Sequence, residues 1–222
     1  MTDRVSRGTP PPPAVAAELF GRRLWLARRY ADLLCGPGVE RGLLGPREAA
    51  VVWERHLLNC AVVAADLPAG ATVADIGSGA GLPGLVWAVQ RPDLVITLVE
   101  PLLRRSRFLH EAVEQLGLAN VTVLRARADD LPESAAYKVV TARAVAPLDR
   151  LVHWCLPLVS DDGALYAFKG RSAADELAKT RATLRAMNAR SAELKTYGEG
   201  VVIPPATVVV VRPGWGRHER TS

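Results

Sequence analysis

Small residues gather in one short stretch of the chain, where they leave the backbone open to a ligand. Residues 73–84 read VADIGSGAGLPG, with four glycines after an apolar run that begins at Thr72. Residues 79–84 fit the G-x-G-x-x-G pattern of dinucleotide-binding turns, which is weak evidence by itself in a chain with 18 glycines. Because a glycine turn between a strand and a helix lets a ligand approach the backbone closely, we expect a binding site here.

Three acids follow the first three predicted strands. Asp75 lies two residues before Gly77, Glu100 closes the second strand, and Asp129 follows the third. A carboxylate beside the turn repels a pyrophosphate, but it attracts the sulfonium and ammonium groups of S-adenosylmethionine. Glu100 can accept hydrogen bonds from both ribose hydroxyls, and Asp129 can accept one from the adenine amino group. Together with Gly79 of the turn, these acids predict a site for S-adenosylmethionine.

Each of these acids also has a structural interpretation. Asp75 could cap the turn, and Glu100 could cap the helix that opens at Pro101. Asp129 and Asp130 could form a solvated loop. We favour cofactor binding because the three acids are expected at one edge of one sheet.

The segment after the fourth predicted strand should face the methyl acceptor, and it carries no obvious base. Residues 139–147 read VVTARAVAP. They lack the Asn-Pro-Pro-Tyr or Asp-Pro-Pro-Tyr sequence that grips an exocyclic amine, and the Pro-Cys nucleophile of pyrimidine carbon-5 methylation. Cys155 lies among apolar residues and is expected in the core. Guanine N7 has a free lone pair and needs no deprotonation, although a small amine or carboxylate could also attack unaided.

Basic residues lie near the same predicted edge and could bind phosphates. Residues 100–171 nevertheless hold ten Lys or Arg against nine Asp or Glu, so an ordinary solvated surface is an equal alternative. The basic positions are Arg104, Arg105, Arg107, Arg125, Arg127, Arg143, Arg150, Lys169 and Arg171.

The elements that would position these residues alternate along the chain. Two helices are expected over 14–35 and 46–65, before the glycine turn. Strands are predicted at 72–76, 94–99, 121–125, 137–142, 164–168, near 190–196, and at 206–212. Helices are predicted between them at 81–90, 102–116, 147–158 and 173–189. This order predicts an α/β fold with a doubly wound, mostly parallel sheet, and the last two strands can pair antiparallel because no helix separates them.

Length, charge and cysteine content narrow the class of protein. A chain of 222 residues that is 49% hydrophobic can fill one sizeable core. Its net charge of +5 is only a hint of a polyanionic partner. The three cysteines lack the spacing of a zinc site and fit a reducing cytoplasm, so we expect no metal. No leader peptide or long apolar run is present, so we expect no membrane segment.

The pattern also divides the chain into four expected parts. Residues 1–13 form a flexible proline-rich tail and 14–68 a small helical extension. Residues 69–213 form the S-adenosylmethionine-binding methyltransferase core, and 214–222 a C-terminal tail.

Five segments, taken in order, resemble the RsmG family, also called GidB. They are WERHLLN (53–59), DIGSGAGLPG (75–84), LVEPLLRRSRFL (98–109), TARAVAPL (141–148) and ALYAFKG (164–170). The resemblance implies a bacterial, cytoplasmic enzyme with a Rossmann-like class I methyltransferase fold. Such an enzyme uses S-adenosylmethionine to methylate N7 of a guanine in 16S ribosomal RNA. The resemblance also implies cofactor contacts at Gly77, Leu82, Ala128, Asp129 and Arg143.

Arg143 is the residue that we expect to join cofactor and substrate. A guanidinium could bind the methionyl carboxylate or an RNA phosphate, but it cannot act as a base near neutral pH; its alternative role is a structural ion pair. His56 could simply pack between the first helices. The chain departs from the family at Asn59, where Asp is more frequent, and at Ala80, where Pro is frequent.

RNA contacts are expected from a subset of the basic residues, and the protein is expected to act as a monomer on 16S rRNA or the small ribosomal subunit. Two rival functions remain: a methyltransferase for a small molecule or protein, and a noncatalytic nucleotide-binding sensor. The residues predicted to contact RNA are Arg104, Arg105, Arg127 and Lys169.

Overall fold

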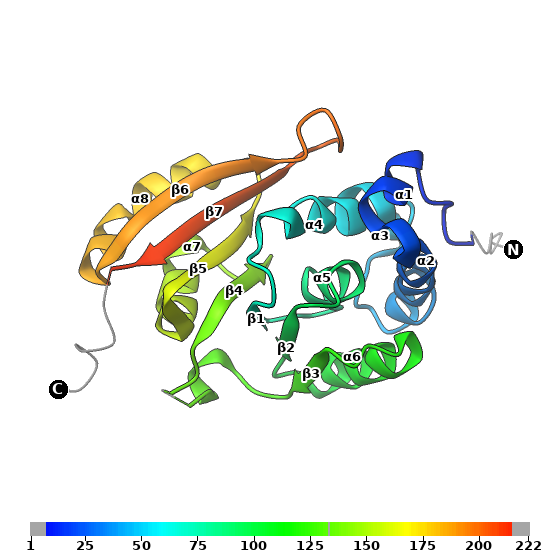
Figure 1. The fold of residues 1–222 in the computed structure, drawn as a ribbon, viewed down its shortest axis with the longest axis horizontal. Coiled ribbons are helices and arrows are strands. Elements are labelled where there is room, and N and C mark those ends of the chain that lie inside the picture. The colour runs from blue at the N-terminus through cyan, green and yellow to red at the C-terminus, as the bar shows by residue number, and fades with distance from the viewer. Residues whose placement is uncertain (1–7, 133, 215–222) are drawn as a thin grey trace, which may run out of the picture.

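The structure, a computed structural model, describes residues 8–132 and 134–214. The outer parts of both predicted tails, residues 1–7 and 215–222, lie outside this range. A seven-stranded sheet runs through the molecule in the order β3-β2-β1-β4-β5-β7-β6 (Figure 1). The strands are β1 Thr72–Ile76, β2 Val95–Val99, β3 Val121–Leu124, β4 Tyr137–Arg143, β5 Val159–Lys169, β6 Ala189–Tyr197 and β7 Ala206–Pro213.

The first five strands are parallel, and the last two complete the sheet as an antiparallel hairpin. β1 pairs with β2 and β4, and β4 pairs with β5, all in parallel. β7 pairs antiparallel with β5 and with β6. The mostly parallel sheet and the antiparallel edge confirm the predicted fold class.

Helices cover both faces of the sheet because successive strand residues point to opposite sides. Val73 and Val139 face a core shared with the N-terminal helices, α5 and α6. Ala74 and Val140 face a second core shared with α7 and α8. The helices are α1 Ala14–Phe20, α2 Leu24–Leu33, α3 Pro46–Ala49, α4 Asn59–Ala61, α5 Gly84–Gln90, α6 Leu103–Leu116, α7 Leu148–Cys155 and α8 Ala173–Ala186.

The N-terminal extension is more broken than its periodicity predicts. The predicted helix over 14–35 is interrupted at Gly21, which has a φ of 49° and ends α1. In place of one helix over 46–65, a wide π-helical segment, Val52–Leu58, lies between α3 and α4. Apolar spacing marks the buried face of such a segment but does not distinguish its helix type, and Trp53 and Leu57 are indeed buried.

Two other boundaries differ from the prediction. β5 begins at Val159, five residues before the predicted strand, directly after the single turn Leu156–Leu158. The helix expected from residue 81 begins at Gly84, because residues 77–83 are needed for the turn.

The sheet order places a ligand site between two strands. The chain leaves β1 toward β2 on one side, and β4 lies on the other side of β1, so the connections diverge at the carboxyl ends of β1 and β4. Such a switch point is where open α/β sheets bind ligands. The glycine turn follows β1, and the Ala-Arg-Ala segment ends β4, so both predicted motifs lie at this point.

Candidate functional site: two pockets at the switch point

The glycine turn is held in shape by close contacts on three sides. A Cβ at Gly77 would lie 2.7 Å from Val145 Cγ2, and one at Gly81 would lie 2.4 Å from Leu85 Cδ1. Tyr30 of α2 donates a hydrogen bond to Ala80 O at 2.7 Å. The N-terminal extension therefore braces the turn from behind. Gly79, in contrast, has a φ of +59°, and a Cβ there would meet only Gly77 O, at 3.8 Å, so this side of the turn leaves room for a ligand.

Asp75 is fully buried and holds the first turn of α5. Its Oδ2 accepts a hydrogen bond from Gly84 N at 3.0 Å, which is the capping role considered from the sequence. A Cβ at Gly84 would lie 2.3 Å from Leu98 Cδ2, so only glycine permits this close approach. Burial raises the pKa of the Asp75 carboxyl to about 7. Oδ1 has no hydrogen-bond partner among the described residues.

Glu100 is turned inward to the backbone of the turn. It is 1% exposed, and its Oε2 accepts a hydrogen bond from Gly79 N at 2.9 Å. Its Oε1 accepts one from Leu102 N at 3.0 Å, beside the start of α6. Arg105 Nη1 lies 3.9 Å from Oε2. The carboxylate thus fixes the glycine turn to the segment that follows β2, and each oxygen retains a further lone pair.

The smaller of two pockets lies beside these acids. It has a volume of about 280 Å³ and is mostly apolar, with the Asp129 carboxylate at its edge. An apolar slot with one acid is suited to a flat heterocycle that carries an amino group. Its lining residues are Ile76, Gly77, Val99, Pro101, Ala126, Arg127, Ala128, Asp129, Val145 and Trp154. The pocket therefore brings together Gly77, Ala128 and Asp129, three of the residues predicted to contact the cofactor.

The larger pocket, of about 780 Å³, lies on the other side of the β4 end. It is lined by the N-terminal extension, the ends of β4 and β5, the start of α8 and the hairpin between β6 and β7. Five of its residues are charged, and four of these are basic. The lining residues are Arg55, Asn59, Arg143, Ala144, Ala146, Phe168, Lys169, Gly170, Arg171, Glu176, Pro204, Pro205 and Thr207.

Arg143 ties this pocket to the N-terminal extension. Its Nη2 donates to Arg55 O at 2.7 Å and faces His56 Nδ1 at 3.0 Å. Its Nη1 lies 3.0 Å from Cys60 Sγ and 3.4 Å from His56 O. Four acceptors from one segment therefore surround a guanidinium that also lines the pocket. These contacts are hydrogen bonds rather than the ion pair considered from the sequence.

His56 is packed between the helices and is held neutral. Burial, and then the charge of Arg143, lowers the pKa of the His56 imidazole to about 4. Arg143 can only donate, so His56 Nδ1 is the acceptor and Nε2 carries the hydrogen. Nε2 lies 2.9 Å from Glu48 Oε2, without the alignment of a hydrogen bond. His56 is thus a link between α3 and Arg143, and it is 8% exposed.

Lys169 and Glu176 form a partly buried ion pair at the wall of the larger pocket. Lys169 Nζ lies 2.9 Å from Glu176 Oε2 and donates to Ala146 O at 2.8 Å, and its side chain is 6% exposed. Glu176 also accepts hydrogen bonds from Leu148 N and Ser172 Oγ. These bonds outweigh partial burial and lower the pKa of the Glu176 carboxyl. Lys169 is a hydrogen-bond donor, and the Glu176 carboxylate is fully engaged, so neither side chain is available as a general base.

The basic residues predicted from the sequence divide into two groups. Arg104 and Arg127 are exposed, and Arg127 lies at the mouth of the smaller pocket. Arg105 is half-buried beside Glu100, and Lys169 is engaged as described. Cys155 is buried, and burial raises the pKa of its thiol to about 12, which confirms its place in the core.

Several pocket residues escaped the sequence analysis. Arg55, Pro204 and Pro205 line the larger pocket, and Asn59 Nδ2 donates to Pro204 O across 145 positions of sequence. The only signal for Arg55 and Asn59 was the segment WERHLLN, whose polar residues interrupt an apolar run, and no signal in the sequence marked Pro204 and Pro205. Leu82, expected from the family at the cofactor, packs partly buried against the core under the turn.

Solved structures show the same fold. An S-adenosylmethionine-dependent O-methyltransferase from Thermotoga maritima aligns with a TM-score of 0.52 and 13% identity, over 72% of this chain and 66% of its own. A ribosomal protein L11 methylase from Lactobacillus delbrueckii subsp. bulgaricus aligns with a TM-score of 0.53 and 13% identity, over 70% of this chain and 77% of its own. The chain therefore has the Rossmann-like fold of class I methyltransferases.

Sequence comparisons define the family. The model of GidB, the rRNA small subunit methyltransferase G family, matches residues 24–202, and the chain belongs to this family. A ribosomal RNA small subunit methyltransferase G from Salinispora tropica is 55% identical over 219 residues, covering 95% of this chain and 90% of that protein. Its counterpart from Nocardioides sp. is 52% identical over 223 residues, covering 100% and 88%. The resemblance predicted from the five segments is confirmed.

S-adenosylmethionine is the cofactor of this class, and the residues present fit it. The buried and unpartnered Asp75 Oδ1, the uncrowded side of the turn at Gly79 and the apolar slot with Asp129 match a ligand that carries positive charge and an aromatic amine. Within the described parts of the chain, no cluster of three or more His, Cys, Asp or Glu side chains is arranged to hold a metal ion. None of the helices in those parts has the length and apolar character needed to cross a membrane.

Proposed function

We propose that this protein transfers the methyl group of S-adenosylmethionine to N7 of a guanine in 16S ribosomal RNA. One observation carries the acceptor assignment: the larger pocket is lined by four cations, yet none of its ionisable groups is available as a base. Glu176 is paired with Lys169, and the Nδ1 of the neighbouring His56 already accepts a hydrogen bond from Arg143. A methyl acceptor in this pocket must therefore attack without first being deprotonated, and guanine N7, which has a free lone pair, can do so.

Each pocket has a distinct task in this proposal. The smaller pocket holds the adenosine moiety, with Asp129 accepting from the adenine amino group and Glu100 from the ribose. The glycine turn, at Gly77 and Gly79, holds the methionine moiety, and Asp75 stabilises its positive charge. The larger pocket orients the guanine, and its cations bind flanking phosphates.

When bound, the cofactor supplies an electrophilic methyl group on a sulfonium. The chain's own residues act by positioning and by excluding water. Arg143 holds the wall of the larger pocket through carbonyl groups of the N-terminal extension. Its guanidinium also remains the proposed link to the cofactor carboxylate or an RNA phosphate.

The proposal extends to organisation and setting. We infer a monomer that acts in the cytoplasm on 16S rRNA or the small subunit. Residues 14–68 serve as the helical extension and 69–213 as the methyltransferase core. Hydrogen bonds from Tyr30 and to Arg55 support this division, since they join the extension to the site from outside the sheet.

A methylation assay tests the proposal directly. Unmodified 16S rRNA and small subunits are incubated with labelled cofactor, and the product is mapped by mass spectrometry. We expect one 7-methylguanosine. Incorporation into a protein or a small amine, with no guanine modified in either RNA substrate, would overturn the proposal.

A further inference from the structure

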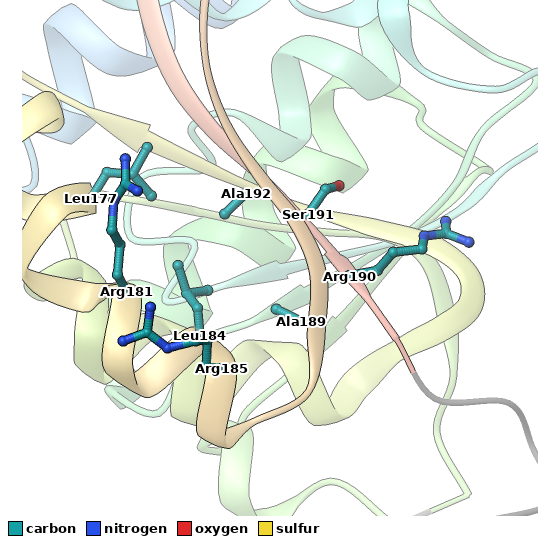
Figure 2. Close-up of a pocket in the computed structure, with 8 residues that line it drawn as sticks. All are labelled: Leu177, Arg181, Leu184, Arg185, Ala189, Arg190, Ser191 and Ala192. Carbon is teal, nitrogen blue, oxygen red and sulfur yellow. The ribbon is translucent and has the colours of Figure 1, made fainter.

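A third pocket lies away from the switch point, between α8 and the edge strand β6 (Figure 2). Its volume is about 260 Å³. We call it, with its rim, the α8–β6 surface. Apolar side chains form its floor and arginines its rim, and its residues are Leu177, Arg181, Leu184, Arg185, Ala189, Arg190, Ser191 and Ala192.

The charge of this surface is all of one sign. Residues 177–192 contain four basic residues, Lys179, Arg181, Arg185 and Arg190, and no Asp or Glu. All four side chains are exposed. No hydrogen bond or ion pair joins the guanidinium groups of the three arginines to any residue in the described part of the chain. Their charge is therefore not neutralised by the protein itself.

The arginines are spread along the surface and do not converge. Arg181 and Arg185 are one helical turn apart and rise from the same side of α8, whereas Arg190 extends from β6 away from that helix (Figure 2). A single small anion would contact only one or two of them. Guanidinium groups spread over a surface in this way suit a partner with repeated negative charge, because each can form a bidentate pair with a phosphate.

Helix α8 leads from the larger pocket to this surface. Glu176 lines the pocket, and the next residue, Leu177, lines the α8–β6 surface. With a rise of about 1.5 Å per residue, Arg181 lies roughly 8 Å and Arg185 roughly 14 Å along the helix from Glu176. Arg171, just before α8, is exposed at the pocket itself. A strand that leaves the pocket along α8 would meet these cations in succession.

We propose that the α8–β6 surface binds the phosphate backbone of the RNA whose guanine occupies the larger pocket. The identity of the RNA rests on the proposed function. The surface adds affinity at a distance from the reaction, and it contributes nothing to the cofactor site or to methyl transfer itself.

The test compares two triple variants with equal loss of charge. R181A/R185A/R190A removes the proposed contacts, and R22A/R28A/R29A removes three exposed arginines at the opposite end of the molecule. Binding of unmodified 16S rRNA is measured over a range of salt concentrations. Each lost phosphate contact lowers the slope of log K against log salt by about 0.7 for a single strand. We expect the first variant to lose about 2 from this slope and at least tenfold in affinity at low salt.

Two further measurements show whether the variant affects RNA binding alone. For R181A/R185A/R190A, affinity for S-adenosylhomocysteine and kcat at saturating RNA should equal those of the unaltered protein. If the triple variant fails to fold, R181A and R190A alone should each lower the slope by about 0.7. Equal slopes in the two triple variants, or in the single variants and the unaltered protein, would overturn the proposal that the α8–β6 surface binds RNA. Absence of methylation by the unaltered protein would overturn the proposed function instead, while the binding slopes would still decide on the surface.

Discussion

The two pockets at the switch point are assembled in different ways. The smaller pocket and its acids come from β1, β2, the segments directly after β1 to β4, and Trp154 of α7, the helix that follows β4. The larger pocket gathers residues from the N-terminal extension, two strand ends, α8 and the last hairpin. Arg143 meets its partners across 87 and 88 positions of sequence. One pocket is thus built from successive repeats of a local unit, and the other only exists once the whole chain has folded.

The pockets nevertheless use charge in a similar way. Asp75 and Glu100 accept hydrogen bonds from backbone N–H groups around the glycine turn, and Arg143 donates to backbone carbonyls opposite. Asp75 and Glu100 thereby hold the two ends of the glycine turn, and Arg143 holds the π-helical segment Val52–Leu58 against the end of β4. Charged groups that look like ligand contacts in the sequence are also the supports of the loops that contact the ligand. Variants that affect one pocket and spare the other will separate these roles.

The largest effect is expected from Glu100→Gln. The amide places a donor against Gly79 N or Leu102 N, which breaks one of two buried hydrogen bonds and frees the turn. Loss of such a charge-assisted bond costs about 1.5–3 kcal/mol, so affinity for S-adenosylhomocysteine should fall about 100-fold. Titration calorimetry measures this affinity.

Glu114→Gln is the matched control, because Glu114 is exposed on α6. RNA affinity of Glu100→Gln should change less than threefold. Equal losses of cofactor and RNA affinity, with a lowered melting temperature, would mean that the variant is generally unfolded and would contradict a specific effect on the cofactor site.

A somewhat smaller effect is expected from Arg143→Lys. One ammonium cannot satisfy acceptors on Arg55, His56 and Cys60 together, so the wall of the larger pocket should loosen. We expect kcat/KM for RNA to fall about 30-fold, equivalent to about 2 kcal/mol, through kcat more than KM. Steady-state kinetics on 16S rRNA measure both constants, with the exposed Arg47→Lys as control.

Affinity for S-adenosylhomocysteine distinguishes two roles of Arg143. An unchanged affinity is expected if the guanidinium acts through the pocket wall. A loss as large as that in kcat/KM would show that it binds the cofactor directly, as the sequence first suggested.

What the sequence could predict follows the same division between the pockets. Alternating strand and helix patterns and the glycine turn are local signals, so the parallel sheet and the position of the acids at the ends of its strands could be predicted, whereas the switch point depends on the strand order. Asp75 and Glu100 lie at the strand ends where the sequence predicted them. Their burial could not be predicted, because residue spacing does not reveal which way a carboxylate turns. Lys169 pairs with Glu176, and Arg55 joins the larger pocket, only through the tertiary fold.

Cofactor binding should depend on pH through Asp75. Its folded-state pKa is about 7, and a cation bound nearby favours the ionised form. Affinity should therefore rise with pH up to about 7 and level off above it, and it should fall by up to tenfold per unit below that pH. Calorimetry with S-adenosylmethionine over roughly three pH units, from about pH 5.5 to about pH 8.5, measures this change in affinity.

Asp75→Asn supplies the control for this pH dependence. The amide oxygen can still accept from Gly84 N, so binding should become weaker but flat with pH. The raised pKa also has a consequence for stability: the contribution of the carboxyl is present below its unfolded pKa of about 3.9 and is lost as pH rises through about 7. At pH 8 the variant should therefore be at least as stable as the parent. A pH profile of binding shared by both proteins would assign the titration to another group.

The smallest effect is expected at the rim of the larger pocket, from Arg55→Ala combined with Arg171→Ala. Both residues are exposed, and the surface pair between Arg55 and Glu48 contributes only about 0–1 kcal/mol to stability. Removal of two phosphate contacts should raise KM for RNA three- to tenfold and leave kcat and cofactor affinity unchanged. The same kinetics in rising salt should show a shallower dependence of kcat/KM on salt. A change in cofactor affinity would show that the two pockets are coupled through the Arg55 carbonyl and Arg143, and the separation between them would then fail.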